Sequence, residues 1–166
     1  MNCKPLVLVL AALVFGPGWL QASSSPAKEA LCEKEASALA REGKLEQGID
    51  AIGQCIKKNP SGAKAYVVLG YLLLDKGDTQ QSLTSFNKAL ELRPRSSAAK
   101  TGKGIILLQR GELKEAEALL KDALKLNPDP TRTYYELGLL YEQLGDMQKA
   151  LSHFKQGITS REQEKR

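Results

Sequence analysis

Glycine recurs at a fixed interval in this sequence: Gly43, Gly77, Gly111 and Gly145 lie 34 residues apart. A period of about 20 to 50 residues indicates copies of one supersecondary unit. The 166 residues hold four copies, so the chain is not expected to fold around a single closed core. The other columns with this period are Pro60, Pro94 and Pro128; Ala36, Gly70, Gly104 and Gly138; Cys55, Ala89, Ala123 and Gly157; and Ile52, Phe86, Leu120 and Phe154.

Each copy carries the apolar spacing of two helices, which is clearest in the second copy. Residues 63–76 place apolar side chains on one face of a predicted helix, and the sequence around Gly77 is typical of a turn. Leu83, Phe86 and Leu90 continue the helical spacing, and Pro94 stops the second helix. Small residues allow the two antiparallel backbones to approach closely. These small residues are Gly70, Ser82 and Ala89.

The columns resemble the tetratricopeptide repeat. The matching residues of the second copy are Tyr66, Leu69, Gly70, Leu73, Gly77, Ser82, Phe86, Ala89 and Pro94. The third copy has Lys100 and Lys103 where the family has an aromatic residue and Leu, the fourth has Glu162 in place of Pro, and the first copy departs most. The resemblance implies an all-α fold, a right-handed α-α superhelix of four 34-residue helix-turn-helix repeats with a concave groove. The predicted repeats are residues 29–62, 63–96, 97–130 and 131–164.

The first 22 residues have the pattern of a secretory signal peptide. A short positive start precedes an apolar run from Pro5 to Phe15, and small residues follow. We expect cleavage after Ala22, a linker at residues 23–28, and a two-residue charged tail at 165–166. An uncleaved N-terminal anchor is the alternative. Cleavage predicts an exported protein, periplasmic or secreted, with no stable membrane span.

The composition excludes several classes of function. There are 24 Lys and Arg against 19 Asp and Glu, and this mixed charge does not mark a nucleic-acid binder. The single histidine, His153, leaves no catalytic triad, and it is expected to be solvated. One His and three Cys leave little from which to build a metal site. We therefore predict no enzyme, no cofactor and no metal.

Two of the three cysteines, Cys32 and Cys55, lie in the first copy, near the start of its first helix and the end of its second. These ends are neighbours in an antiparallel pair, and an exported protein can keep a disulfide. The prediction is a Cys32–Cys55 bond. The alternative is two buried thiols that act as small hydrophobic groups.

The resemblance also assigns residues to the groove by their position in the first helix of each repeat. A family subtype grips a C-terminal carboxylate with Lys and Asn at two of these positions. That pair is absent here, and a mainly apolar strip remains, which suits a partner helix or extended segment. Packing between repeats is the alternative for some of these residues, more so for Leu74 and Leu108 than for Tyr71 and Tyr135. The predicted groove residues are Val67, Tyr71, Leu74, Thr101, Ile105, Leu108, Tyr135 and Leu139.

Three functions fit these features. The first is an exported scaffold that holds a peptide or helix of an envelope protein during assembly of a pilus, secretion or cytochrome complex. The second is a self-assembling structural module, because the last helix leaves Leu151 and Ile158 without a predicted cover and so allows a homo-oligomer. The alternative for that helix is a solvated, charged end. The third is an accessory subunit of an enzyme.

Overall fold

The computed structural model describes residues 26–126 and 130–163, and all regular structure in this part is α-helical. This confirms the predicted fold class. The first helix begins at Pro26, inside the predicted linker, while the predicted signal peptide and charged tail lie outside the described residues. The helices are α1 (Pro26–Arg41), α2 (Leu45–Lys58), α3 (Ala63–Lys76), α4 (Thr79–Leu92), α5 (Ser97–Gln109), α6 (Leu113–Leu126), α7 (Thr131–Gln143) and α8 (Met147–Gln163).

The turn between the two helices of each copy depends on its periodic glycine. Gly77 follows the last residue of α3 and has φ +89°, and the backbone N–H of Asp78 then donates to the carbonyl oxygen of Leu73 at 2.9 Å. This left-handed conformation is strained for residues with a Cβ atom, and glycine adopts it freely. Gly43, Gly111 and Gly145 also have positive φ, so the period of 34 marks the turns, as predicted.

The two helices of the second copy approach closely because their contact residues are small. The buried hydroxyl of Ser82 on α4 donates a hydrogen bond to the carbonyl oxygen of Gly70 on α3 at 2.7 Å. A Cβ atom at Gly70 would lie 2.6 Å from the Phe86 ring, and one at Gly102 on α5 would overlap the same ring. Phe86 is fully buried and contacts glycine on both sides, so it joins the second copy to the third.

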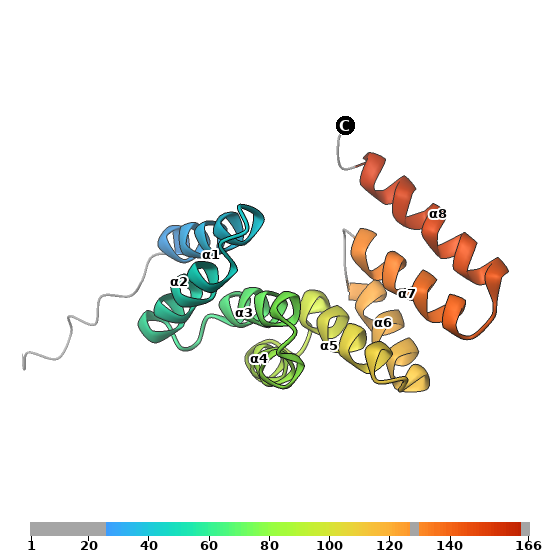
Figure 1. Cartoon of the computed structure of the whole chain (residues 1–166), viewed down its shortest axis with the longest axis horizontal. Helices are drawn as coiled ribbons and strands as arrows, with labels where there is room; N and C mark the ends of the chain where they lie inside the picture. Colours follow the sequence, from blue (N-terminus) through green and yellow to red (C-terminus); the bar gives the residue numbers. More distant parts are fainter. Residues whose placement is uncertain (1–25, 127–129, 164–166) are drawn as a thin grey trace, which may run out of the picture.

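The helix pairs follow one another in sequence order from α1 and α2 at one end to α7 and α8 at the other (Figure 1). The first helices of the copies also contact one another in the order α1, α3, α5, α7. Within the described part, the second helices α2, α4, α6 and α8 make no such contacts with one another. A stack that is closer on one side than on the other curves toward the close side. The first helices therefore form the concave face.

The core is divided along the array and does not form one central cluster. Separate buried clusters join the first copy to the second, the second to the third, and the third to the fourth. Each copy therefore buries apolar side chains against the next copy as well as between its own two helices, as expected for a repeat architecture. Residues at the centres of these clusters are Ala36, Ile52, Leu72; Phe86, Ala89, Ile106; and Leu120, Leu137, Leu140.

Candidate functional site

The concave face has a hollow of about 270 Å³ between α5 and α7. Three predicted groove residues, Ile105, Leu108 and Leu139, meet there. Ile105 and Leu108 are buried and offer only part of their side chains, whereas Leu139 is half-buried. The packing interpretation that the sequence left open for Leu108 fits this burial. The other lining residues are polar: Gln109, Glu136, Glu142 and Gln143.

Thr101 holds α5 against α7 and does not face a partner. Its buried hydroxyl shares a hydrogen bond of 2.9 Å with the hydroxyl of Thr133, which is also buried. Thr101 occupies a position that lines the groove in the family, but in this protein it makes a contact between the third and fourth copies.

Tyr71 ties α3 to the two following copies. Its hydroxyl donates to the carbonyl oxygen of Ala98 at 2.8 Å, and its ring meets Phe86 edge to face, with centroids 5.0 Å apart. The Arg132 guanidinium lies over the Tyr71 ring, 4.1 Å from its centroid. Burial raises the pKa of Tyr71 to about 12, although Arg132 acts to lower it. Val67 and Leu74 pack in the same cluster, so this part of the predicted strip stabilises the stack.

Tyr135 lies one helical turn before Leu139 on α7 but lines a different hollow. Its side chain is 53% exposed and lines a second hollow of about 260 Å³ between α7 and α8, with Phe154, Ile158 and Arg161. The Tyr135 and Phe154 ring centroids are 5.6 Å apart. The predicted strip is therefore divided into three places: the α5–α7 hollow, the cluster around Phe86, and this end of the array.

Glu136 is a concave-face residue that the sequence analysis missed. It is 7% exposed and lines the α5–α7 hollow, and its Oε1 atom lies 4.0 Å from Nε of Arg132. Burial raises the pKa of this carboxyl, and the Arg132 guanidinium acts in the opposite direction. Aligning the four copies could have singled out Glu136, because the residue type in its column differs from copy to copy. The same column has Lys34, Val68 and Gly102. The third copy thus has a glycine at the position where the fourth copy has a carboxylate.

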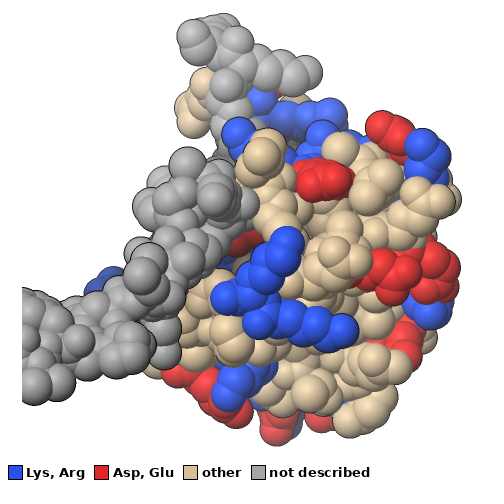
Figure 2. Space-filling view, turned by 90° about the vertical axis from the view of Figure 1, so that its left-hand side faces the viewer, with Lys and Arg blue, Asp and Glu red and all other residues tan. Residues whose placement is uncertain are grey.

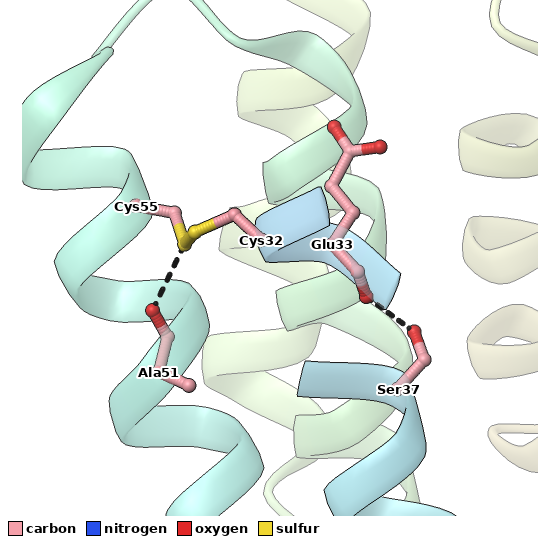
Figure 3. Close-up of a disulfide and its surroundings, with 5 residues drawn as sticks. All are labelled: Cys32, Glu33, Ser37, Ala51 and Cys55. Atoms are coloured by element: carbon pink, nitrogen blue, oxygen red, sulfur yellow. Dashed lines mark hydrogen bonds between the residues drawn. A yellow bond between two sulfur atoms is a disulfide. The ribbon is translucent and has the colours of Figure 1, made fainter. Parts of the chain in front are cut away.

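The two helices of the first copy are cross-linked at the end away from their connecting turn (Figure 3). Cys32 on α1 and Cys55 on α2 form a disulfide, with Cα atoms 6.3 Å apart, which is within the usual range for such bonds. The carbonyl oxygen of Ala51 lies 3.1 Å from the Cys55 sulfur, and the Ser37 hydroxyl donates to the Glu33 carbonyl oxygen at 2.8 Å. The predicted pairing is thus geometrically satisfied, and the oxidation state in the cell stays a prediction.

His153 differs from the solvated residue that the sequence predicts. Its ring stacks on Tyr141, with centroids 5.3 Å apart, and lies 6.0 Å from the Tyr134 ring. Burial lowers the pKa of His153, which favours the neutral ring. Tyr141 donates a hydrogen bond to Glu117 on α6 at 2.6 Å, so this stack helps to join the last two copies.

The charged surface mixes both signs. On the end of the molecule seen in Figure 2, Lys and Arg side chains cross the middle of the face, and Asp and Glu side chains lie above them and toward the right-hand and lower edges. Among residues 26–126 and 130–163, no group of three or more His, Cys, Asp or Glu side chains could hold a metal ion. In the same residues, no helix has the length and hydropathy needed to cross a membrane.

The sequence profile described as tetratricopeptide repeat matches residues 33–97, 69–129 and 101–164. These matches extend over most of the chain. The chain belongs to the tetratricopeptide repeat family. Proteins of this family typically act as non-enzymatic scaffolds that bind protein partners. No curated protein is similar enough to match the whole chain or part of it.

Several solved structures share this fold. MamA from Desulfovibrio magneticus RS-1 is 25% identical with a TM-score of 0.63, and the alignment covers 82% of this chain and 77% of that one. TTC0263, a thermophilic protein of Thermus thermophilus, is 22% identical with a TM-score of 0.71, covering 79% and 73%. PilF of Pseudomonas aeruginosa is 20% identical with a TM-score of 0.69, and the match spans 80% of this chain and 60% of PilF. These likenesses concern the fold.

Proposed function

We propose that this protein is an exported, non-catalytic scaffold whose concave face holds a peptide or helix of an envelope partner during assembly of a larger complex. Complexes of the pilus, secretion or cytochrome type fit this role. The observation that carries the proposal is the hollow between α5 and α7, where half-buried Leu139 is surrounded by polar side chains. Apolar anchors with a few polar groups around them are typical of sites that bind peptide segments.

Two features support export. The first 22 residues have the order of a signal peptide, and Cys32 and Cys55 lie in position for a disulfide, a bond that persists in oxidising compartments. The purified envelope form is expected to begin at Ser23, and N-terminal mass analysis of the protein from its own cells tests this. A chain that still begins at Met1 and is recovered from the cytosol would contradict export.

The binding face is tested with a substitution at the edge of the hollow. Tyr71 is unsuitable because its ring supports Phe86. Gln109 is exposed and lines the hollow, so Gln109→Trp fills the site without opening the core. Affinity capture from the cell envelope should recover a partner with the wild type and lose it with Gln109→Trp. The matched control is Gln148→Trp on α8, which is exposed outside the hollow and should keep the partner.

A self-assembling module is the second candidate, and the exposed apolar surface at the last copy favours it. Leu151 and Ile158 on α8 are 55% and 61% exposed, and exposed Tyr135 lies beside Ile158 in the end hollow. Apolar patches of this kind mark contact surfaces. Oligomers that grow with concentration in the absence of any ligand, and that disappear with Ile158→Lys, would favour this function over the scaffold.

A further inference from the structure

The α5–α7 hollow combines acidic and apolar groups without a basic side chain. Two carboxylates, Glu136 and Glu142, line it, together with the carboxamides of Gln109 and Gln143. Its apolar part consists of Ile105, Leu108 and Leu139, and none of its lining residues is Lys, Arg or His. The charge of the hollow is therefore complementary to a cation.

Glu136 is the deepest polar group of this hollow. A buried carboxylate is costly unless a partner compensates for the lost hydration. Its ion pair with Arg132, one helical turn away, is long, with 4.0 Å between Nε and Oε1. The Arg132 side chain is itself 53% exposed and lies over the Tyr71 ring. This weak pairing agrees with the raised pKa of Glu136, so a second cation would gain from approaching the carboxylate through the hollow.

The fold does not require a carboxylate here. At the equivalent position of the third copy, Gly102 makes room for the Phe86 ring, and the second copy has Val68. The contact between copies is thus made elsewhere in the array without a buried acid. A costly group that packing does not require is a candidate for binding.

We propose that this hollow binds the side chain of a Lys or Arg residue carried on an apolar segment of the partner protein. The aliphatic stem packs against Leu139 and the exposed edges of Ile105 and Leu108, and the charged head reaches Glu136. Glu142, which lines the same hollow, adds to its negative charge. Flanking apolar residues of the segment lie along the concave face. This inference rests on the proposed scaffold function and specifies the chemistry of its partner.

The test is selection of peptides from a random short-peptide library against the purified protein. We expect the selected peptides to carry Lys or Arg among apolar residues. Their affinity, measured by fluorescence anisotropy, should fall about 10- to 100-fold with Glu136→Gln, as for loss of a hydrogen bond to a charged group. Replacing the basic residue of the peptide by Gln should cost a similar factor, and the two losses should not add.

Controls separate the possible outcomes. Glu115→Gln removes the same charge from an exposed position on α6 and should leave the affinity unchanged. Gln109→Trp should abolish binding, which places the peptides in the hollow. Peptides that are lost with Gln109→Trp but lack a basic preference, or that bind Glu136→Gln equally well, overturn this inference and leave the scaffold function standing. If no selected peptide is sensitive to Gln109→Trp, both proposals fail.

Discussion

The first and third copies have the same register of helices and turns, yet they are held together differently. In the first copy, Ala36 is the one buried residue of α1 between residues 30 and 41, and a disulfide joins the helix to α2. In the third copy, every residue of α5 from Gly104 to Leu108 is buried. The third copy has neighbours on both sides, whereas α1 contacts only α2 and α3 among the described helices. A copy with fewer neighbours thus has a covalent link where an internal copy has packing.

The largest expected effect is loss of packing in the third copy. Leu120 is fully buried, and a Cβ atom at Gly104 would lie only 2.8 Å from its side chain. Leu120→Ala should lower the free energy of unfolding by about 2–5 kcal/mol, measured by urea denaturation. The control Leu31→Ala, at a side chain that is 66% exposed on α1, should change it by less than about 0.5 kcal/mol. Equal costs would remove the contrast between the two copies.

The next effect concerns the cross-link. Cys32→Ser combined with Cys55→Ser opens a loop with a sequence separation of 23 and should cost about 3 kcal/mol through the freedom regained by the unfolded chain. Hydrogen exchange should accelerate in α1 and α2 and stay unchanged in α5 and α6. Reducing the wild type should reproduce the result. Acceleration spread evenly over the array would show that the bond does not act locally.

A third prediction compares two glycines of α2. A Cβ atom at Gly48 would lie 2.7 Å from the Ala36 carbonyl oxygen on α1, which is backbone and cannot turn aside. Gly48→Ala should therefore destabilise the first copy by about 1–3 kcal/mol, as overpacking does. At Gly53 a Cβ atom would meet nothing within 4 Å, so Gly53→Ala should stabilise the helix by about 0.5–1 kcal/mol. A melting temperature that falls with Gly48→Ala and rises with Gly53→Ala would confirm the close approach of α1 and α2 at Gly48. A rise with both substitutions would contradict it.

The smallest effect is a dependence on pH in the fourth copy. Burial raises the folded-state pKa of Glu136 above its unfolded value, so the folded chain binds the extra proton. This contribution to stability is present below the unfolded pKa and is lost as pH rises through the folded pKa. Hydrogen bonds to lysines lower the pKa of Asp122 and Asp146, whose contributions are instead lost as pH falls. The free energy of unfolding, measured by urea denaturation at several pH values, is compared between the wild type and Glu136→Gln, which isolates the contribution of Glu136. If the difference between the two proteins does not vary with pH, the raised pKa of Glu136 is contradicted.

The sequence was sufficient for the features that repeat. Gly77 occupies the left-handed turn, Ser82 and Gly70 allow the close approach of α3 and α4, and α4 ends at Leu92, just before Pro94. These positions depend on contacts within one copy, which are the same wherever the copy lies in the array. A fixed period therefore predicts them directly.

The candidate site was predicted less well because it depends on contacts between copies. Thr101 and Tyr135 share one column, yet Thr101 is buried against Thr133 and Tyr135 is mostly exposed at the end of the array. Glu136 escaped because a lone acid in a helix is usually solvated. Only the three-dimensional stack shows that Glu136 is buried and lines the hollow between α5 and α7.

Phe86 sets how far the copies can act as independent units. Its ring fits against Gly70 of its own copy and Gly102 of the next, so opening either copy uncovers the same aromatic surface. The equivalent Phe154 contacts Gly138 in its own copy and is only partly buried. This shared ring is expected to couple the opening of the second copy to that of the third. The fourth copy has neither a disulfide nor a second neighbour among the described helices, so it is expected to open first, and the α5–α7 hollow lies at its junction with the third copy.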